Sequence, residues 1–283
     1  MRILITGASG LLGHDLVDCF QEDEILAPRS HELNILEPNQ VCNFIAGHKL
    51  DWIIHCAAYT DVDASEAHQD LAFAVNRDAT TSLSRAAADT GSRLLYISTD
   101  YVFDGLSNRP YEPHDSVNPI NIYGVSKAAG ESAVRNHASQ WLIVRSSWLF
   151  GGARVCFPEK ILLAAASQPL VKVVNDQIGS PTYTRDLADA IRRLVRKEAR
   201  GTLHVTNSEH CSWLEFAREI LRKAGRQTPV LPISSVDSQR AAKRPPYSVL
   251  SPLALAAHGI RLRPWSDALD AYLDELRRMR KLR

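Results

Sequence analysis

Short apolar runs alternate with longer amphipathic stretches over the first half of the chain. Five runs are rich in Ile, Leu and Val, as expected for parallel strands that are buried on both faces; they cover residues 2–5, 24–27, 51–55, 93–98 and 141–145. Between them, apolar positions recur at intervals of three and four residues, which predicts helices over 11–20, 38–47, 70–90 and 122–137. This alternation predicts an α/β fold, a doubly wound parallel sheet of the Rossmann type.

The pattern is less regular after residue 150. Helices are predicted around two short strands, at 160–167, 183–197, 213–224 and 266–280, with the strands at 171–174 and 202–205. Prolines divide the region from 228 to 265 into short pieces, because proline interrupts both helices and sheet ladders. We therefore expect a smaller, loop-rich C-terminal lobe beside the sheet.

Charge and apolar length exclude two classes of partner. The 283 residues include 33 Lys+Arg and 32 Asp+Glu, and a net charge of +1 gives no reason to expect nucleic-acid binding. The basic end at 277–283 is expected to be solvated. Apolar runs such as 161–166 are far shorter than the roughly 18 residues that a membrane span needs, so no membrane association is expected.

Cysteine and histidine spacing gives no sign of a metal site. The five cysteines are odd in number and contain no Cys-x-x-Cys pair, which argues against a disulfide framework and a zinc site. The histidines contain no His-x-x-x-His pair. We expect a reducing, cytoplasmic setting and no metal.

A glycine-rich segment joins the first predicted strand to the first predicted helix. Gly7, Gly10 and Gly13 stand where glycine lets backbone amides approach a pyrophosphate, and the helix N-terminus adds its positive dipole. The alternative is a merely tight turn. The placement of the motif favours dinucleotide binding, and the predicted contacts in this segment are Gly7, Ser9, Gly10, Leu11, Leu12 and Gly13.

The end of the second strand bears on cofactor choice. An NAD site places a carboxylate here for the ribose 2′-hydroxyl, whereas this chain has Arg29 and Ser30, which suit a 2′-phosphate. NADPH is therefore the predicted cofactor. In the alternative interpretation Arg29 is a solvated loop residue.

Three residues form the candidate catalytic set. Tyr123 and Lys127 are four residues apart, so on a helix they share one face. An adjacent ammonium is expected to lower the pKa of the phenol from about 10 towards the range useful for acid–base catalysis. Thr99 lies at the C-terminal end of the fourth strand, where α/β sheets hold ligands, and its hydroxyl suits a substrate carbonyl. Without these companions a Tyr-x-x-x-Lys pair is usually surface decoration.

Together these residues resemble the extended short-chain dehydrogenase/reductases, and within that superfamily the dTDP-4-dehydrorhamnose reductases. The resemblance covers nearly the whole chain. It rests on several motifs in the same order, at 98–105 (STDYVFDG), 110–111 (PY), 123–124 (YG), 145–151 (RSSWLFG), 176–182 (DQIGSPT), 213–217 (WLEFA) and 244–250 (RPPYSVL).

The resemblance implies roles for further residues. Cofactor contacts implied by it, in addition to the catalytic Tyr123 and Lys127, are Asn34, Ile35, Ala57, Ala58, Tyr59 and Thr60. The family often has an aspartate where Asn34 stands, so use of NADH also stays open. Contacts to the sugar nucleotide are implied for Val62, Thr99, Asp100 and Trp148. Arg244, Arg154 and Lys160 could each pair with the diphosphate, and arginine suits that task because its planar fork matches phosphate oxygens; surface placement is the alternative for Arg154 and Lys160. Packing roles for Val62 and Trp148 are the alternatives.

The resemblance also implies an activity. We expect NAD(P)H-dependent reduction of the C4 ketone of dTDP-4-dehydro-β-L-rhamnose to dTDP-β-L-rhamnose, an activated sugar for surface polysaccharide. Residues 1–150 would form the dinucleotide-binding domain. Residues 151–283 would form mainly a substrate-binding lobe, with some segments returning to the sheet. Alternatives are reduction of another nucleotide-linked 4-keto-6-deoxysugar, or a non-catalytic NADP-binding subunit similar to the regulatory subunit of methionine adenosyltransferase. Some family members are reported to bind magnesium at a subunit interface, which leaves a homodimer open, but exposed helix carboxylates explain Asp63, Glu66 and Asp70 more simply.

Overall fold

The computed structural model describes residues 1–152 and 154–279. Its main sheet has six parallel strands in the order β10-β5-β4-β3-β1-β2. The strands are β1 (Arg2–Thr6), β2 (Glu24–Leu26), β3 (Trp52–His55), β4 (Arg93–Thr99), β5 (Trp141–Ser146) and β10 (Gly201–His204). The strand order reverses between β1 and β3, which is where doubly wound sheets bind ligands. The predicted α/β fold is confirmed.

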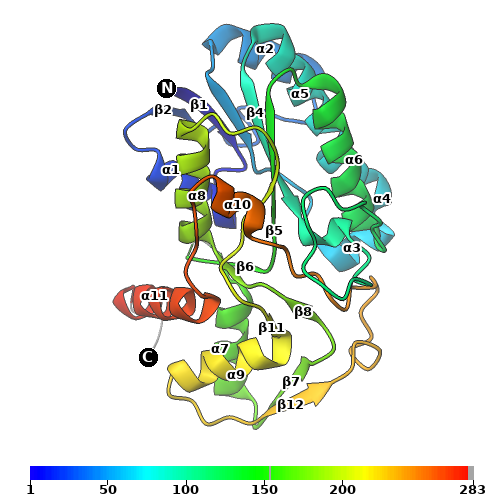
Figure 1. The fold of residues 1–283 in the computed structure, drawn as a ribbon, viewed down its shortest axis with the longest axis vertical. Coiled ribbons are helices and arrows are strands. Elements are labelled where there is room, and N and C mark those ends of the chain that lie inside the picture. The colour runs from blue at the N-terminus through cyan, green and yellow to red at the C-terminus, as the bar shows by residue number, and fades with distance from the viewer. Residues whose placement is uncertain (153, 280–283) are drawn as a thin grey trace.

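Helices cover both faces of this sheet (Figure 1). They are α1 (Leu11–Cys19) and α8 (Thr184–Arg196) on one side, and α2 (Pro38–His48), α5 (Ala79–Thr90) and α6 (Ile122–His137) on the other. Side chains alternate between the two faces along a strand. Thus Ile3 and Ile5 pack in the cluster that contains residues of α1 and α8, whereas Leu4 packs in the cluster that contains residues of α2, α5 and α6. Burial on both faces explains the continuous apolar runs.

A separate hydrophobic cluster, named the second cluster because it forms the core of the second lobe, lies beyond the C-terminal end of the sheet. Its helices are α7 (Phe157–Ser167), α9 (Trp213–Lys223) and α11 (Trp265–Arg278). Three two-stranded sheets accompany them, pairing β6 (Leu149–Phe150) with β9 (Thr182–Tyr183), β7 (Val171–Val174) with β12 (Val230–Ile233), and β8 (Ile178–Gly179) with β11 (Cys211–Ser212). Strand β10 and helices α8 and α10 (Leu253–Ala257) return to the main sheet.

One predicted helix is interrupted. The stretch predicted as one helix over 70–90 consists of α4 (Gln69–Phe73), a π-helical turn at Ala74–Asp78 and α5. Within the turn, Asn76 bonds the backbone of Tyr59 and the hydroxyl of Ser126. These contacts to distant segments account for a widened turn that helical periodicity does not reveal. The short helix α3 (Val62–Ala67) lies outside the predicted helix ranges, although Asp63 and Glu66 were interpreted as helix carboxylates.

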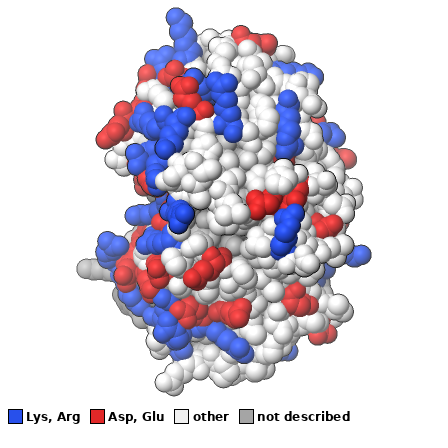
Figure 2. Space-filling model, viewed as in Figure 1, with Lys and Arg blue, Asp and Glu red and all other residues white. Residues whose placement is uncertain are grey.

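The predicted helix over 266–280 runs from Trp265 to Arg278, and residue 280 lies outside the described residues. Among the helices that the structure describes, none has the length and apolar character needed to cross a bilayer. Acidic and basic side chains are interspersed over the face shown in Figure 2. This mixture accompanies the near-zero net charge.

Candidate active site

A cavity of about 640 Å³ lies at the C-terminal edge of the sheet. Its walls come from the segments that follow β1, β3, β4 and β5, and from the second cluster. The predicted site residues among its lining are Gly7, Ser9, Gly10, Leu11, Leu12, Gly13, Ala57, Ala58, Thr60, Val62, Thr99, Asp100, Tyr123, Lys127 and Trp148. Segments that are distant in sequence therefore meet at the switch point.

The glycine-rich loop is built for close backbone approach. Gly7 has φ +71°, in the left-handed region that favours glycine. A Cβ at Gly13 would lie 2.1 Å from the carbonyl oxygen of Gly7. The amide of Gly10 donates to that same carbonyl at 2.8 Å, which folds the loop tightly against the start of α1. This cradle at a helix N-terminus fits a pyrophosphate.

The candidate catalytic residues share this cavity. Thr99 ends β4, and Tyr123 and Lys127 lie one turn apart near the start of α6, whose N-cap Asn121 accepts from the amide of Gly124 at 2.8 Å. Lys127 is 2% exposed. Its Nζ donates to the carbonyl of Ile97 at 2.6 Å and lies 4.0 Å from the ring centroid of Tyr96. These contacts fix the Lys127 side chain in the wall of the cavity.

Burial governs the protonation of Tyr123 and Lys127. It raises the pKa of Tyr123 to about 12; a hydrogen bond with Thr99 opposes the rise and the charge of Asp100 adds to it. Burial also lowers the pKa of Lys127 to about 7. The expectation that Lys127 lowers the pKa of Tyr123 is therefore wrong for this structure. A phenol that stays protonated at neutral pH is nevertheless the form that donates a proton in a reduction.

Asp100 connects Thr99 to the C-terminal region. The hydroxyl of Thr99 donates to Oδ1 of Asp100 at 3.0 Å, and the hydroxyl of Ser248 donates to Oδ2 at 2.5 Å. Burial raises the pKa of Asp100 to about 6, although both hydrogen bonds oppose that rise. The carboxyl group therefore holds the Thr99 side chain while being poorly solvated itself.

Several predicted cofactor residues lie outside the described lining of this cavity. Arg29 and Ser30 are exposed after β2, and the backbone amide of Arg29 donates to Oε2 of Glu32 at 2.7 Å. Asn34 and Ile35 are half-buried nearby. The peptide group of Tyr59 is held by the Asn76 side chain. The structure thus brings the glycine loop to the catalytic residues and leaves the predicted adenosine contacts at the surface beyond them.

Arg244 is engaged by a carboxylate. Its guanidinium donates to both oxygens of Asp63 on α3, at 2.9 and 2.7 Å, and it is absent from the described cavity lining. The Arg244 hydrogen bond is the main reason why the pKa of Asp63 falls to about 2. Glu66 accepts from the amide of Ile122 at 2.9 Å. Asp63 and Glu66 therefore anchor neighbouring segments.

The structure adds lining residues that sequence reasoning missed. They include Tyr101, Ser146, Ser147 and Trp213. Arg154, a candidate for the diphosphate, also lines the cavity. Tyr101 lies inside the STDYVFDG motif, so its position next to Asp100 was an available signal. Trp213 comes from the second cluster; it begins the WLEFA motif at 213–217, but nothing in that motif places it next to Trp148.

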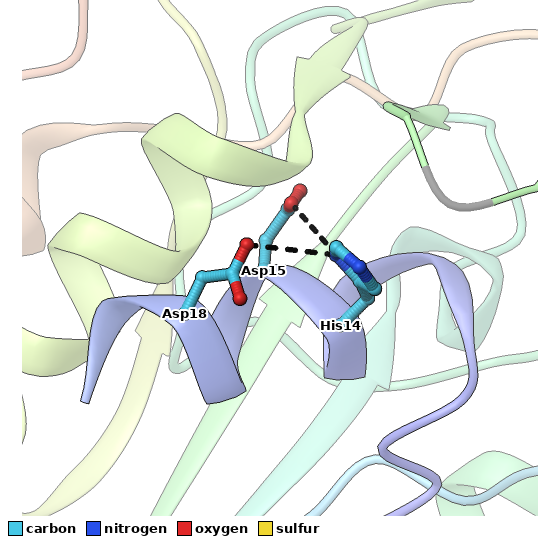
Figure 3. Close-up of side chains that lie close together, drawn as sticks. All are labelled: His14, Asp15 and Asp18. Atoms are coloured by element: carbon cyan, nitrogen blue, oxygen red, sulfur yellow. Dashed lines mark ion pairs between the residues drawn. The ribbon is translucent and has the colours of Figure 1, made fainter. Parts of the chain in front are cut away.

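One group of potential metal ligands lies on α1, outside the cavity. Figure 3 shows His14, Asp15 and Asp18, with ligand atoms within 4.8 Å of one another. His14 and Asp18 are exposed, and Nε of Arg185 lies 3.9 Å from Oδ1 of Asp15. A guanidinium already supplies positive charge to this group, so its simplest interpretation is a set of ion pairs.

Comparisons with known proteins agree with this geometry. Residues 1–278 match the family model of the RmlD substrate binding domain. A dTDP-4-dehydrorhamnose reductase of Mycobacterium tuberculosis (strain H37Rv) is 40% identical over 278 residues, covering 95% of this chain and 91% of that protein. A dTDP-4-keto-6-deoxy-D-glucose reductase of Streptomyces niveus is 37% identical, with 95% of each chain covered. The crystal structure of a Bacillus anthracis dTDP-4-dehydrorhamnose reductase in complex with NADP has a TM-score of 0.94 at 38% identity, covering 97% of this chain and 99% of that chain.

Proposed function

The chain belongs to the RmlD substrate-binding domain family, of the dTDP-4-dehydrorhamnose reductase type of NAD(P)H oxidoreductase, and from that premise we propose that it reduces the C4 ketone of dTDP-4-dehydro-β-L-rhamnose with NADPH. The product would be dTDP-β-L-rhamnose, an activated sugar for surface polysaccharide. The observation that carries the proposal is the meeting of Thr99, Tyr123 and Lys127 with the glycine-rich loop in one cavity.

The loop fits the cofactor because Gly13 lets α1 pack directly against it: a Cβ at Gly13 would lie 2.1 Å from the carbonyl oxygen of Gly7 and would displace the loop whose backbone amides a pyrophosphate needs. The backbone amides at the start of α1 would hold that group, and Lys127 would hold the nicotinamide ribose. NADPH, when bound, supplies the hydride that adds to C4. Tyr123 donates its proton to the oxygen of the former ketone, and Thr99 hydrogen-bonds that oxygen so that the carbonyl is oriented towards the phenol.

The two parts of the chain would bind different ligands. Residues 1–150 would bind the dinucleotide and residues 151–283 mainly the sugar nucleotide; the contribution of Trp213 to the cavity supports this assignment. The free state of all five cysteines supports a reducing, cytoplasmic setting. A homodimer, which rests on the resemblance alone, is tested by sedimentation of the purified protein.

A second substrate has a specific observation in its favour. The Streptomyces relative is named for a 4-keto-6-deoxy-D-glucose sugar nucleotide and matches at nearly the same identity. Both substrates are 4-keto-6-deoxysugars on dTDP, and the same three residues would act on either. The relative kcat/KM for the two ketosugars decides between them.

The test is direct. Purified protein is mixed with NADPH and enzymatically prepared dTDP-4-dehydrorhamnose, and absorbance at the nicotinamide band is followed. We expect substrate-dependent oxidation; its absence with both NADPH and NADH would refute the catalytic proposal and favour a regulatory NADP-binding subunit. Tyr123→Phe is expected to abolish reduction while cofactor affinity stays nearly unchanged, because only the proton donor is removed. Turnover within tenfold of wild type would remove Tyr123 from that role.

A further inference from the structure

Trp148 has an unusual backbone conformation for a large aromatic residue. Its φ is +47°, in the left-handed region where side chains other than glycine are strained. Such a conformation persists only where the surroundings impose it. The residue follows β5 by two positions, and its carbonyl accepts from the amide of Thr182 at 3.2 Å.

Two residues outside β5 hold the indole itself. The Trp148 ring stacks on Trp213, with centroids 3.6 Å apart and an interplanar angle of 8°. It also lies against Gly179, where a Cβ would come within 2.5 Å of ring atom Cε2. Both contacts depend on one structural unit: Gly179 of β8 pairs with Cys211 of β11, and Trp213 is the first residue of α9 immediately after β11.

Trp213 is itself held in place by its neighbours in the second cluster. Ser212 and Glu215 form a capping box that fixes the first turn of α9, where Trp213 stands. The ring of Phe157 packs on Trp213 at a centroid distance of 4.4 Å. The stack is therefore built from the second cluster outwards, and Trp148 is its member nearest the main sheet.

The stacked indoles lie in the wall of the cavity that contains the candidate catalytic residues. Both indoles line the cavity, and Trp148 lies two residues after Ser146, which pairs with Thr99 across β4 and β5. The two indoles add apolar surface to the cavity wall. The C–H groups and methyl group of a 6-deoxyhexose offer the complementary apolar surface, since ligand pockets combine such walls with a few polar groups that set orientation.

We propose that Trp213 is a positioning residue: it holds the Trp148 indole as the apolar wall against which the 6-deoxyhexose ring is oriented for reduction at C4. This inference rests on the proposed function and assigns to Trp213 a part in sugar selection that the catalytic residues do not provide. Cofactor binding does not depend on it.

Circular dichroism reports the stack without reference to activity. Two indoles stacked face to face couple their transition dipoles and give an exciton couplet in the far ultraviolet. Trp213→Ala and Trp213→Phe should both abolish the couplet. Trp141→Phe is the matched control, because Trp141 begins β5 at the end away from the cavity; it should leave the couplet intact.

Kinetics then test the role. Trp213→Ala should lower kcat/KM for the ketosugar roughly tenfold or more, mainly through KM, while KM for NADPH changes by less than about twofold. Trp213→Phe should recover most of kcat/KM, since a flat ring still supports Trp148. Gly179→Ala should reproduce the loss with Trp213 intact, because the new methyl group displaces the Trp148 ring.

The outcomes separate this proposal from the proposed function. A couplet that survives Trp213→Ala, or a wild-type kcat/KM in either Trp213→Ala or Gly179→Ala, overturns the positioning role. If Trp213→Ala fails to fold, as judged by its far-ultraviolet spectrum and Tm, Trp213→Phe and Gly179→Ala carry the test. Wild-type protein that shows the couplet but reduces no ketosugar refutes the proposed function and this role in sugar orientation together, while the stack itself stands.

Discussion

Replacing Asp100 by asparagine should stabilise the protein above pH 6 and impair its activity. Asp100 is 2% exposed and sits between the hydroxyls of Thr99 and Ser248. Asparagine has the same shape, and its amide can accept from one hydroxyl and donate to the other. The substitution therefore removes the buried charge and leaves the packing intact.

The magnitude follows from the raised pKa. Burial moves the pKa of Asp100 from 3.8 to about 6, and at 1.36 kcal/mol per pKa unit the difference corresponds to about 3 kcal/mol. Between these two values the folded protein binds more protons than the unfolded chain, so stability falls as pH rises from about 4 and the loss is complete above about 6. Asp100→Asn has no carboxyl group that titrates at this position, so its free energy of unfolding does not undergo this decrease. Its stability relative to wild type should rise by up to about 3 kcal/mol between pH 4 and pH 8.

Urea unfolding of both proteins at pH 4.5, 6 and 8 measures the effect, provided that each transition is two-state. Asp104→Asn is the control of opposite sign. Hydrogen bonds, chiefly from the amide of Leu106, lower the pKa of Asp104, so Asp104→Asn should lose stability relative to wild type as pH rises. A stability difference between Asp100→Asn and wild type that does not change with pH would refute the assignment of a raised pKa to Asp100. Reduction by Asp100→Asn should be impaired because the single amide oxygen cannot accept from both the Thr99 and the Ser248 hydroxyl, so the hydrogen bonding that orients Thr99 changes.

Three further substitutions test the residues that surround and support the candidate site. Gly13→Ala should abolish cofactor binding in a fluorescence titration, whereas Gly47→Ala, with open space around its Cβ, should bind normally; equal binding by both would contradict the cradle. Glu131→Gln should destabilise the fold by about 3–5 kcal/mol, because Arg145 is 1% exposed and would lose its bidentate carboxylate partner; an unchanged urea midpoint would contradict this. Arg29→Ala should weaken NADPH binding more than NADH binding, with a smaller loss at high salt; equal kcat/KM for the two cofactors in wild type, unchanged by Arg29→Ala, would identify Arg29 as a solvated loop residue.

Local patterns were sufficient for the elements that the main sheet buries. Strands β1, β3, β4 and β5 begin and end within a residue of the predictions, because burial on both faces demands the apolar runs that identified them. The helix over 122–137 matches α6 at both ends. The interruption at Asn76 was not predictable in this way, since its cause is a bond to Ser126, 50 residues away.

Site residues, too, were predicted where a local motif implies their geometry and missed where burial or distant contacts decide it. Thr99, Tyr123 and Lys127 were identified because each lies in a short motif whose spacing implies its geometry. The direction of the Tyr123 pKa was wrong because spacing says nothing about burial, and burial is the largest influence on that phenol. Trp213 and Ser248 were missed as site residues because their partners, Trp148 and Asp100, are distant in sequence.

The segment that carries Arg244 and Ser248 makes the first 150 residues dependent on the last 40 for a finished active site. Ser248 reaches back 148 residues to Asp100, and Arg244 reaches back 181 residues to Asp63. Between them Pro245 and Pro246 pack against Gly105, where a Cβ would lie 2.6 Å from the Pro246 ring. Proline restricts the backbone of this segment, so the two polar contacts are held at a nearly fixed separation. The glycine loop and Lys127 take part in none of these contacts, whereas Thr99 and Ser248 share the carboxyl group of Asp100. Under the proposed function, this segment therefore bears on reduction, through Thr99, rather than on binding of the dinucleotide.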